Sequence, residues 1–361
     1  MTNHSSVLPK SAKIPNPLRI LIGVINYLFI ALVGAYGLSV TGQLLLHYIV
    51  GERLKIVAFA DTFAHLLWLP ALVLFPVCLL LRKRRLSLTL LPAVAAFVFT
   101  YGPQFLPRPV TTPAQGEPIR LLTFNILSQT HRFEVTDDIL IQADADIVAM
   151  QEVSYNARSY FLGTHTLDYP YRAFYATSNA AQGMGILSRY PILEESFWLS
   201  DYVPTPRGTL RVVLDGPSGP ITIYNAHPSH PGRSGSRFDP KYRGLEIANL
   251  LERARAEDVP VILMGDFNMP DISDDYVSIT SEYTDAYRTV GWGMGWTFPD
   301  PAGGFPTVLD IIPLPRRLTP VFPFLRLDYV FYREGIYATH AEVWPTSGRS
   351  DHHPLLVDLQ Y

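Results

Sequence analysis

Acidic, amide and imidazole side chains recur at the ends of apolar, strand-like runs in the later part of this 361-residue chain. They are Asn125 in LLTFNIL, Glu152 in MQEV, His227 in YNAHPSH, Asp266 and Asn268 in LMGDFNMP, Asp328 in RLDYVFY, and Asp351 with His352 in SGRSDHHPL. Amide and carboxylate oxygens suit hard cations such as Mg²⁺ or Mn²⁺, whereas a soft-metal site would use cysteine, which is absent from this set. Cleavage of a phosphate ester needs an activated water, neutralised phosphoryl charge and help for the leaving group. These residue types can supply all three.

The elements that must position these residues alternate between strand-like and helical patterns. Strands are predicted at residues 119–124, 146–150, 184–187, 209–214, 221–224, 261–264, 327–332 and 355–359. Helices are predicted at residues 135–143 and 242–256. Apolar runs bounded by turns, with helices between some of them, predict two packed sheets with helices outside, which is an α/β sandwich.

In order and rough spacing, the polar set resembles the endonuclease/exonuclease/phosphatase superfamily, which has the DNase I-like fold. The resemblance covers about residues 119–361 and rests on the QE, GDFN and SDHxP motifs together. It implies a four-layer α/β sandwich. It also implies a divalent-metal-dependent phosphoric ester hydrolase that uses Mg²⁺ or Mn²⁺.

The resemblance implies a metal-binding group within the set. Glu152 would be the main metal ligand, with Asn125 beside it, and Asp351 would complete the metal and hydrogen-bond network.

The resemblance also implies a catalytic group. Asp266 would orient or deprotonate the attacking water, and Asn268 would hold that water and the phosphate. His227 would donate a hydrogen bond to a phosphoryl oxygen or to the leaving group. His352 would contact the phosphate, with Asp328 fixing its tautomer and charge, because an Asp–His pair orients the imidazole and raises its pKa.

Each of these residue types also has an ordinary structural use. An asparagine after a strand, such as Asn125, is commonly a turn former, and Asp351 could cap a turn. His227, which precedes a proline, could be a loop histidine. The occurrence of the whole set in family order favours the functional interpretation.

Two groups of arginines are candidates for substrate binding. Arg207 and Arg211 flank the strand before the NAH motif, and we expect Arg211 to reach the site. A basic cluster after His227 consists of Arg233, Arg237, Lys241 and Arg243. This cluster, with Arg233 and Arg237 foremost, could clamp a second phosphate or an anionic headgroup, or it could be a solvated loop.

Charge is distributed unevenly along the chain. From Glu117 onward there are 19 Lys and Arg against 30 Asp and Glu, a net charge of −11, whereas the preceding residues carry 10 against 2, a net charge of +8. Binding to a phosphate backbone usually requires a broad basic face. The later part of the chain therefore has no strong nucleic-acid signature.

Three apolar runs, at residues 20–40, 56–81 and 86–105, are long enough to cross a bilayer. A cleaved signal peptide is the alternative for the first run, but two more runs follow it. Basic residues cluster before the first run and between the second and third, at Arg82–Arg85, which predicts that these two regions are cytoplasmic. The predicted organisation is a tail with a three-helix membrane anchor (1–105), a proline-rich linker (106–117) and an extracytoplasmic domain (118–361).

Two features of the sequence bear on the substrate. Residues 292–327 are rich in Trp, Phe, Leu and Pro, and this segment could pack on the domain or dip into the membrane interface. In architecture the chain resembles membrane-anchored vancomycin-resistance phosphatases, which implies a lipid-linked or small phosphate substrate. The alternatives are an extracytoplasmic nuclease acting on DNA or RNA and a non-catalytic binding module. The predicted partners are the lipid bilayer, through the three helices, and a phosphate-ester substrate.

Overall fold

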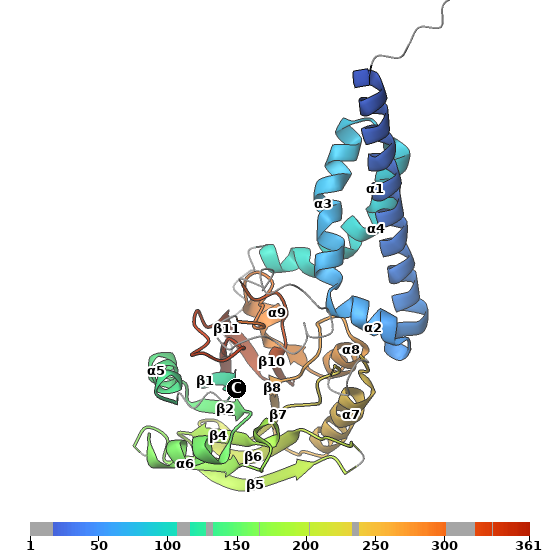
Figure 1. The fold of residues 1–361 in the computed structure, drawn as a ribbon. Helices are drawn as coiled ribbons and strands as arrows, with labels where there is room; N and C mark the ends of the chain where they lie inside the picture. Colours follow the sequence, from blue (N-terminus) through green and yellow to red (C-terminus); the bar gives the residue numbers. More distant parts are fainter. Residues whose placement is uncertain are drawn as a thin grey trace, which may run out of the picture. The chain divides into compact units, whose positions relative to one another are not determined.

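The computed structural model describes residues 17–106, 116–127, 133–165, 167–201, 203–232, 238–300, 322–333 and 335–361 (Figure 1). These residues form two compact units. One unit consists of the chain up to Leu45 together with His65–Val98, and the other consists of Leu46–Ala64 together with Phe99–Tyr361. The unit that holds the sheets thus includes residues 46–64, which the sequence placed with the anchor.

Long apolar helices dominate the first unit. They are α1 (Pro17–Val50), α3 (Ala64–Leu80) and α4 (Arg84–Tyr101), and most of their apolar side chains are exposed. Among the described residues, two helices are long and apolar enough to cross a membrane. The count is three if α2 (Lys55–Thr62) and α3, which meet at a bend of 62°, form one span. The predicted run at 56–81 is therefore not one straight helix, because it breaks at Phe63.

Two six-stranded sheets form the core of the second unit. The first sheet has the order β11-β12-β1-β2-β4-β3 and the second has the order β5-β6-β7-β8-β10-β9. The strands of the first sheet are β1 (Pro118–Asn125), β2 (Ile147–Gln151), β3 (Tyr171–Tyr175), β4 (Met184–Ser188), β11 (Tyr337–Val343) and β12 (Leu355–Gln360). Those of the second are β5 (Ile192–Leu199), β6 (Gly208–Gly216), β7 (Gly219–Ala226), β8 (Val261–Asp266), β9 (Thr284–Asp285) and β10 (Asp328–Tyr332). All eight predicted strands are present.

The sheets and helices form four layers. One apolar core, which includes Leu121, Leu210 and Met264, lies between the two sheets. A second core lies between the first sheet and the helices α5 (Phe133–Ala143) and α6 (Tyr155–Gly163). A third lies between the second sheet and the helices α7 (Lys241–Arg255) and α8 (Asp274–Thr280). Short helices complete the unit: α9 (Ala286–Val290), η1 (Gly51–Arg53), η2 (Gly102–Phe105) and η4 (Ala180–Gln182). The predicted α/β sandwich is confirmed.

Strand pairing brings the ends of several strands to one edge. β1 and β2 are parallel, with Asn125 paired with Gln151, and β7 and β8 are parallel as well. β10 runs antiparallel to β8, so that Asp328, at the start of β10, pairs with Asp266, at the end of β8. Because parallel strands end at the same edge and antiparallel partners begin there, residues distant in sequence meet in one place.

The described part of the apolar 292–327 segment packs on the second unit. Phe298, Leu325 and Leu327 form a small buried cluster, against which Phe63 and Phe324 pack. Residues 301–321 lie outside the described residues.

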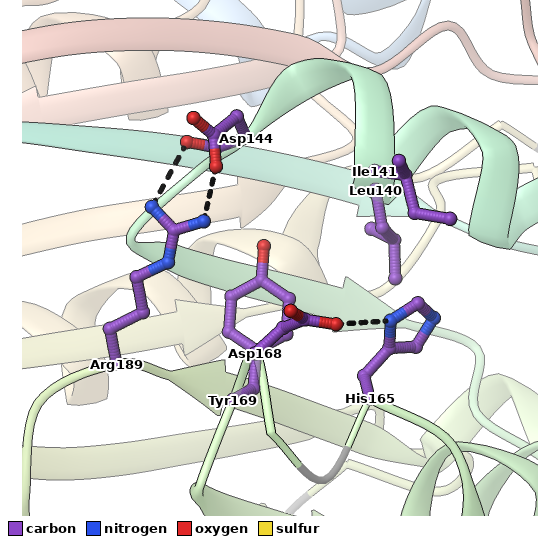
Figure 2. A pocket seen from close by; sticks show the side chains of 7 residues that line it. All are labelled: Leu140, Ile141, Asp144, His165, Asp168, Tyr169 and Arg189. Carbon is purple, nitrogen blue, oxygen red and sulfur yellow. Dashed lines mark hydrogen bonds and ion pairs between the residues drawn. The ribbon is translucent and has the colours of Figure 1, made fainter.

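A polar pocket lies at the opposite end of β2, beside Asp144 and Arg189 (Figure 2). Its charges are paired with one another. Arg189 contacts Asp144, and the two ring nitrogens of His165 face Asp137 at 2.7 Å and Asp168 at 3.5 Å. The His165–Asp137 pair binds α5 to the loop before β3, and we assign the pocket a structural role.

Candidate active site

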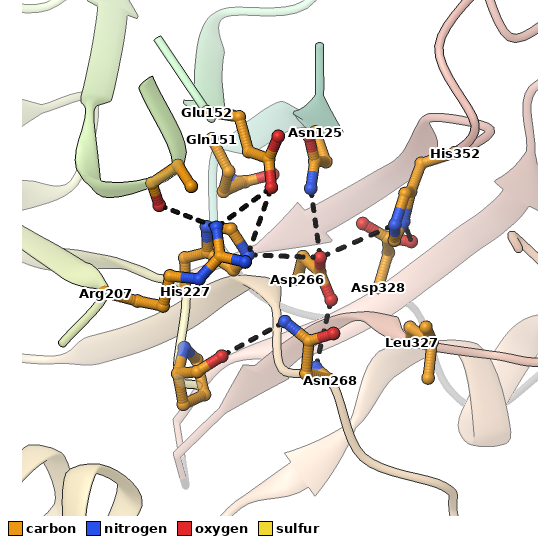
Figure 3. A network of polar contacts seen from close by, with 12 residues as sticks. Asn125, Gln151, Glu152, Arg207, His227, Asp266, Asn268, Leu327, Asp328 and His352 are labelled. Carbon is orange, nitrogen blue, oxygen red and sulfur yellow. Dashed lines mark hydrogen bonds and ion pairs between the residues drawn. The ribbon is translucent and has the colours of Figure 1, made fainter. Parts of the chain in front are cut away.

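Asp266, at the end of β8, lies at the centre of a buried polar network (Figure 3). Its Oδ2 accepts a hydrogen bond from Nδ2 of Asn125 at 3.0 Å, and its Oδ1 accepts one from the backbone N–H of Asn268 at 2.9 Å. Nε2 of His227 and Nε2 of His352 lie 3.4 Å and 3.6 Å from its Oδ2. Burial raises the pKa of Asp266 to about 7, although the neighbouring His352 acts in the opposite direction.

His352 lies between two carboxylates. Its Nδ1 lies 2.8 Å from Oδ2 of the fully buried Asp328, and its Nε2 faces Asp266. Burial by itself lowers the pKa of His352, but Asp328 and Asp266 outweigh burial and raise this pKa to about 10. The imidazole is therefore charged at neutral pH and presents N–H donors. The ring of Phe298 packs against it at 4.7 Å between centroids and limits its movement.

The donor chemistry of the site fits a hard divalent cation. Oxygen atoms of Glu152, Asp351 and Asn125 stand beside the network, and burial, with a contribution from Glu152, raises the pKa of Asp351. Two carboxylates that repel each other in a buried site are stabilised by a cation between them. A second possible metal site consists of Asp266, Asp328 and His352. Each offers one ligand atom, and these three atoms lie within 4.8 Å of one another. The charged His352 is a poor ligand, because a protonated imidazole has no lone pair to donate.

Backbone conformation at the site is unusual in two places. Glu152, directly after β2, has φ of 60°, and Asn268 has φ of 49°. Left-handed conformations cost about 1–2 kcal/mol for residues other than glycine, and they concentrate at functional sites. Gly265 is also required here, because a Cβ at that position would lie 2.0 Å from the carbonyl oxygen of Ala226 on the adjacent strand.

Among the described arginines, Arg207 contacts a predicted metal ligand. Its Nη1 lies 3.0 Å from Oε1 of Glu152 and also donates to the carbonyl oxygen of Ala181 (Figure 3). Arg211, which the sequence analysis favoured, points elsewhere: its guanidinium pairs with Glu257 and Glu194.

The alternation of side chains along β6 explains the direction of Arg211. Leu210, Val212 and Leu214 belong to the core between the sheets, so Arg211 must point to the opposite face. Arg207 has the same parity as Arg211 but lies directly before β6, so alternation excludes Arg211 without selecting Arg207.

Further polar residues, which are not among the predicted site residues, support the site. The side chain of Gln151 donates to Thr123 and to Asn225, which joins the two sheets beside Glu152. Ser350 donates from its hydroxyl to the carbonyl oxygen of Asn125 and accepts a hydrogen bond from the backbone of His352. These bonds hold the predicted site residues in place.

The structure brings all eight motif residues to one edge of the sandwich. The predicted substrate-binding residues Arg233 and Arg237 lie outside the described residues. Arg243, a member of the same predicted basic cluster, is buried and forms ion pairs with Glu52 and Asp275.

Comparison with known proteins agrees with this geometry. A model of the endonuclease/exonuclease/phosphatase family matches residues 122–352. The chain belongs to this family. As a member of it, the protein is a hydrolase of phosphoric esters, and Asp266, Asn268 and His352 all lie in the matched region.

Solved structures of the family share the fold. An endonuclease/exonuclease/phosphatase from Bacteroides vulgatus is 21% identical and has a TM-score of 0.50, covering 68% of this chain and 99% of its own. TDP2 from D. rerio, complexed with a single-strand DNA product, is 16% identical with a TM-score of 0.53, covering 68% of this chain and 100% of its own. A mannosyl-6-phosphatase from Bacteroides thetaiotaomicron is 18% identical with a TM-score of 0.50, covering 67% and 100%. No curated protein matches the chain.

Proposed function

We propose that this protein is a membrane-anchored, metal-dependent phosphoesterase whose substrate is a lipid-linked or small phosphate ester. The observation that carries the proposal is the buried contact of Asp266 with His227 and His352. This arrangement places a carboxylate with a pKa of about 7 beside two imidazoles. A base with such a pKa accepts a proton efficiently near neutral pH.

Three side chains of the site can carry out the hydrolysis of a phosphate ester. Asp266, held by Asn125 and Asn268, orients the attacking water and takes one of its protons. As the water oxygen bonds to phosphorus, the ester P–O bond breaks. The charged His352 donates an N–H to a phosphoryl oxygen, where negative charge increases in the transition state. His227 donates to another phosphoryl oxygen or to the leaving oxygen.

Glu152, Asn125 and Asp351 would hold Mg²⁺ or Mn²⁺. When bound, this cation would neutralise the negative charge of the phosphate. Arg207, which contacts Glu152, adds a fixed positive charge at the same edge.

The composition of the two units supports a topology of three crossings. Because Leu46–Ala64 and Phe99–Tyr361 belong to one compact unit, we assign them to the same side of a membrane, with α3 and α4 as two crossings. α1 then adds one crossing before residue 46. With the basic residues Arg82–Arg85 on the cytoplasmic side, the sheets are extracytoplasmic.

The substrate class follows from the anchor and from charge. An anchored domain searches the plane in which lipid-linked phosphates lie, and the net charge of −11 from Glu117 onward disfavours long nucleic acids. The resemblance in architecture to vancomycin-resistance phosphatases favours the same class. A nuclease is the second candidate, because the structurally similar TDP2 is complexed with a DNA product.

A phosphoester panel tests the proposal. The purified full-length protein is assayed with Mg²⁺ against lipid phosphates, nucleotides, plasmid DNA and RNA, beside Asp266→Ala and Glu152→Ala. We expect release from a lipid phosphate by the wild type and a loss in both variants. Plasmid nicking that weakens as salt rises would support the nuclease instead. Wild-type protein that binds no metal and cleaves no ester would support a binding module.

A fusion experiment tests the orientation. A reporter that is active only outside the cytoplasm is attached after Tyr361, and we expect it to be active. A reporter that works only inside the cell would contradict the proposed topology.

A further inference from the structure

The segment between α1 and α3 packs on the sheet-containing unit through specific polar contacts. The backbone N–H of Glu52 donates to Oδ2 of Asp274, at the start of α8, at 2.9 Å. Gly51 has φ of 63°, and a Cβ at that position would lie 2.6 Å from the same carboxylate oxygen. Only glycine permits both the conformation and the close approach at this point. The contact with Asp274 therefore depends on glycine at position 51.

Aromatic rings extend this contact along α2. Phe59 packs against Phe238 at 5.5 Å between ring centroids, and Phe63 stacks on Phe324 at 6.3 Å. Phe238 precedes α7, and Phe324 precedes β10, which begins at the site residue Asp328. The segment 46–64 thus contacts the residues before α7 and the residues before β10.

Arg243 connects this segment to the centre of the unit. Its side chain is fully buried, Nη2 lies 2.8 Å from Oε2 of Glu52, and Nε lies 2.6 Å from Oδ2 of Asp275. A buried guanidinium requires partners for both its charge and its donors, and these two carboxylates supply them. Removing Glu52 would leave the charge partly uncompensated.

The third contact of Arg243 reaches the active site. Its Nη1 donates to the backbone carbonyl oxygen of Asn268 at 3.0 Å. The backbone N–H of Asn268 donates to Asp266, and its side chain donates to the carbonyl oxygen of Pro228, next to His227. Because Asn268 has a left-handed φ of 49°, its conformation depends on such contacts. Glu52, Arg243, Asn268 and Asp266 form a continuous chain of hydrogen bonds.

We propose that Glu52 is a positioning residue of the active site, which acts through Arg243 on the backbone of Asn268. The segment between α1 and α3 then positions the active site of the hydrolase as well as connecting the two helices. The inference rests on the proposed phosphoesterase function, since Asn268 and Asp266 carry the reaction there. Its structural half, the control of Asn268 by Glu52, can be measured without any activity.

The experiment uses the full-length protein in detergent and compares Glu52→Ala, Glu52→Gln and a control, Arg255→Met. Arg255 lies on the same helix α7 and pairs with Glu282, but its side chain is 55% exposed and far along the helix from Asn268. Activity is measured with bis(p-nitrophenyl) phosphate and Mg²⁺. Hydrogen–deuterium exchange is measured on the peptide that covers residues 264–270.

We expect Glu52→Ala to lower kcat about tenfold with little change in KM, because a small displacement of Asn268 misaligns Asp266 without removing a substrate contact. Exchange at 264–270 should become faster. Glu52→Gln keeps an acceptor for Arg243 but loses the charge, so its kcat should fall only about threefold. Arg255→Met should match the wild type in both measurements.

A folded Glu52→Ala protein with wild-type kcat and wild-type exchange at 264–270 would overturn the proposal. If Glu52→Ala is not recovered folded, Glu52→Gln decides, and identity with the wild type in both measurements has the same consequence. If the wild type cleaves no ester, the proposed function fails, whereas the exchange data still support or refute the role of Glu52.

Discussion

Nη1 of Arg207 lies 3.0 Å from Oε1 of Glu152, which is the predicted main metal ligand. The two side chains are nearly buried, with exposed fractions of 10% and 12%. Arg207 stands just before β6, and Glu152 follows β2, so this ion pair joins the two sheets at the active-site edge. A guanidinium held in this position can contact a phosphoryl oxygen of a substrate bound at Glu152.

The first prediction contrasts this arginine with its neighbour. Arg207→Met should lower kcat/KM on the order of 100-fold, the usual effect of removing one donor from a transition state. Arg211→Met should leave kcat/KM nearly unchanged, because Arg211 pairs with Glu257 and Glu194 on the other face of β6. Steady-state kinetics of the two purified variants provide the measurement. Equal losses in both variants would show that the ion pair with Glu152 has no special role.

The second prediction concerns Asp266. Asp266→Asn preserves the size of the side chain but removes the base, so kcat should fall about 10²- to 10⁴-fold. Because burial raises the pKa of Asp266 to about 7, the folded state disfavours its charge, and the variant should unfold at the same or a higher temperature than the wild type at pH 8. Thermal unfolding and single-turnover rates test both parts. A variant that is inactive because it is less stable would contradict this account.

The third prediction concerns the cation. Chelation by EDTA should abolish activity, and added Mg²⁺ or Mn²⁺ should restore it. Glu152→Gln should raise the metal concentration for half-maximal activity by at least about tenfold, because an amide is a weaker ligand than a carboxylate. A titration of metal against rate measures this concentration. Asp144→Asn serves as the control, since Asp144 lies at the opposite end of β2 and pairs with Arg189. An unchanged titration in Glu152→Gln would exclude Glu152 as a ligand.

The sequence predicted the motif residues and their meeting place well, for a physical reason. Each residue, such as Asp266 or Asp328, stands at the end of an apolar run, and strand ends converge when sheets form. Alternation along β6 could have excluded Arg211, which points away from the core between the sheets. It could not have selected Arg207, which has the same parity and contacts Glu152 because it lies before the strand.

The contact of residues 46–64 with the sheets could not be predicted from the sequence. Glu52 and Arg243 are 191 residues apart, and nothing in either local pattern identifies the other as a partner. One signal was present within the predicted 56–81 span, namely the acidic Asp61. It is buried and lies 2.9 Å from His47, and this part of the run forms the separate helix α2. The apolar pattern alone did not show the bend between α2 and α3.

The fourth prediction concerns stability and pH at Glu257, beyond the end of α7. Its carboxylate accepts hydrogen bonds from Arg211 at 2.5 Å and 2.8 Å, from the hydroxyl of Tyr224 at 2.6 Å and from Thr222 at 3.1 Å. The bonds from Arg211, foremost, lower the pKa of Glu257 below its ordinary value, although burial opposes them. The folded state therefore binds this proton less tightly than the unfolded state does. The resulting stabilisation is present above the unfolded pKa of about 4.5 and is lost as the pH falls through the folded pKa.

Glu257→Gln should consequently lower the free energy of unfolding at pH 7 by about 1–3 kcal/mol, the range for a hydrogen-bonded charged group. The difference from the wild type should shrink as the pH falls below the unfolded pKa of about 4.5 and through the lowered folded pKa, because the wild-type carboxylate then takes up a proton. Glu194→Gln is the matched control, because Glu194 contacts the same guanidinium at 3.0 Å but is 65% exposed, and its loss should cost less than about 1 kcal/mol. Denaturant unfolding at several pH values between 3 and 8 gives these energies. A difference that is constant over this range, or equal in the two variants, would mean that the charge of Glu257 does not stabilise the fold.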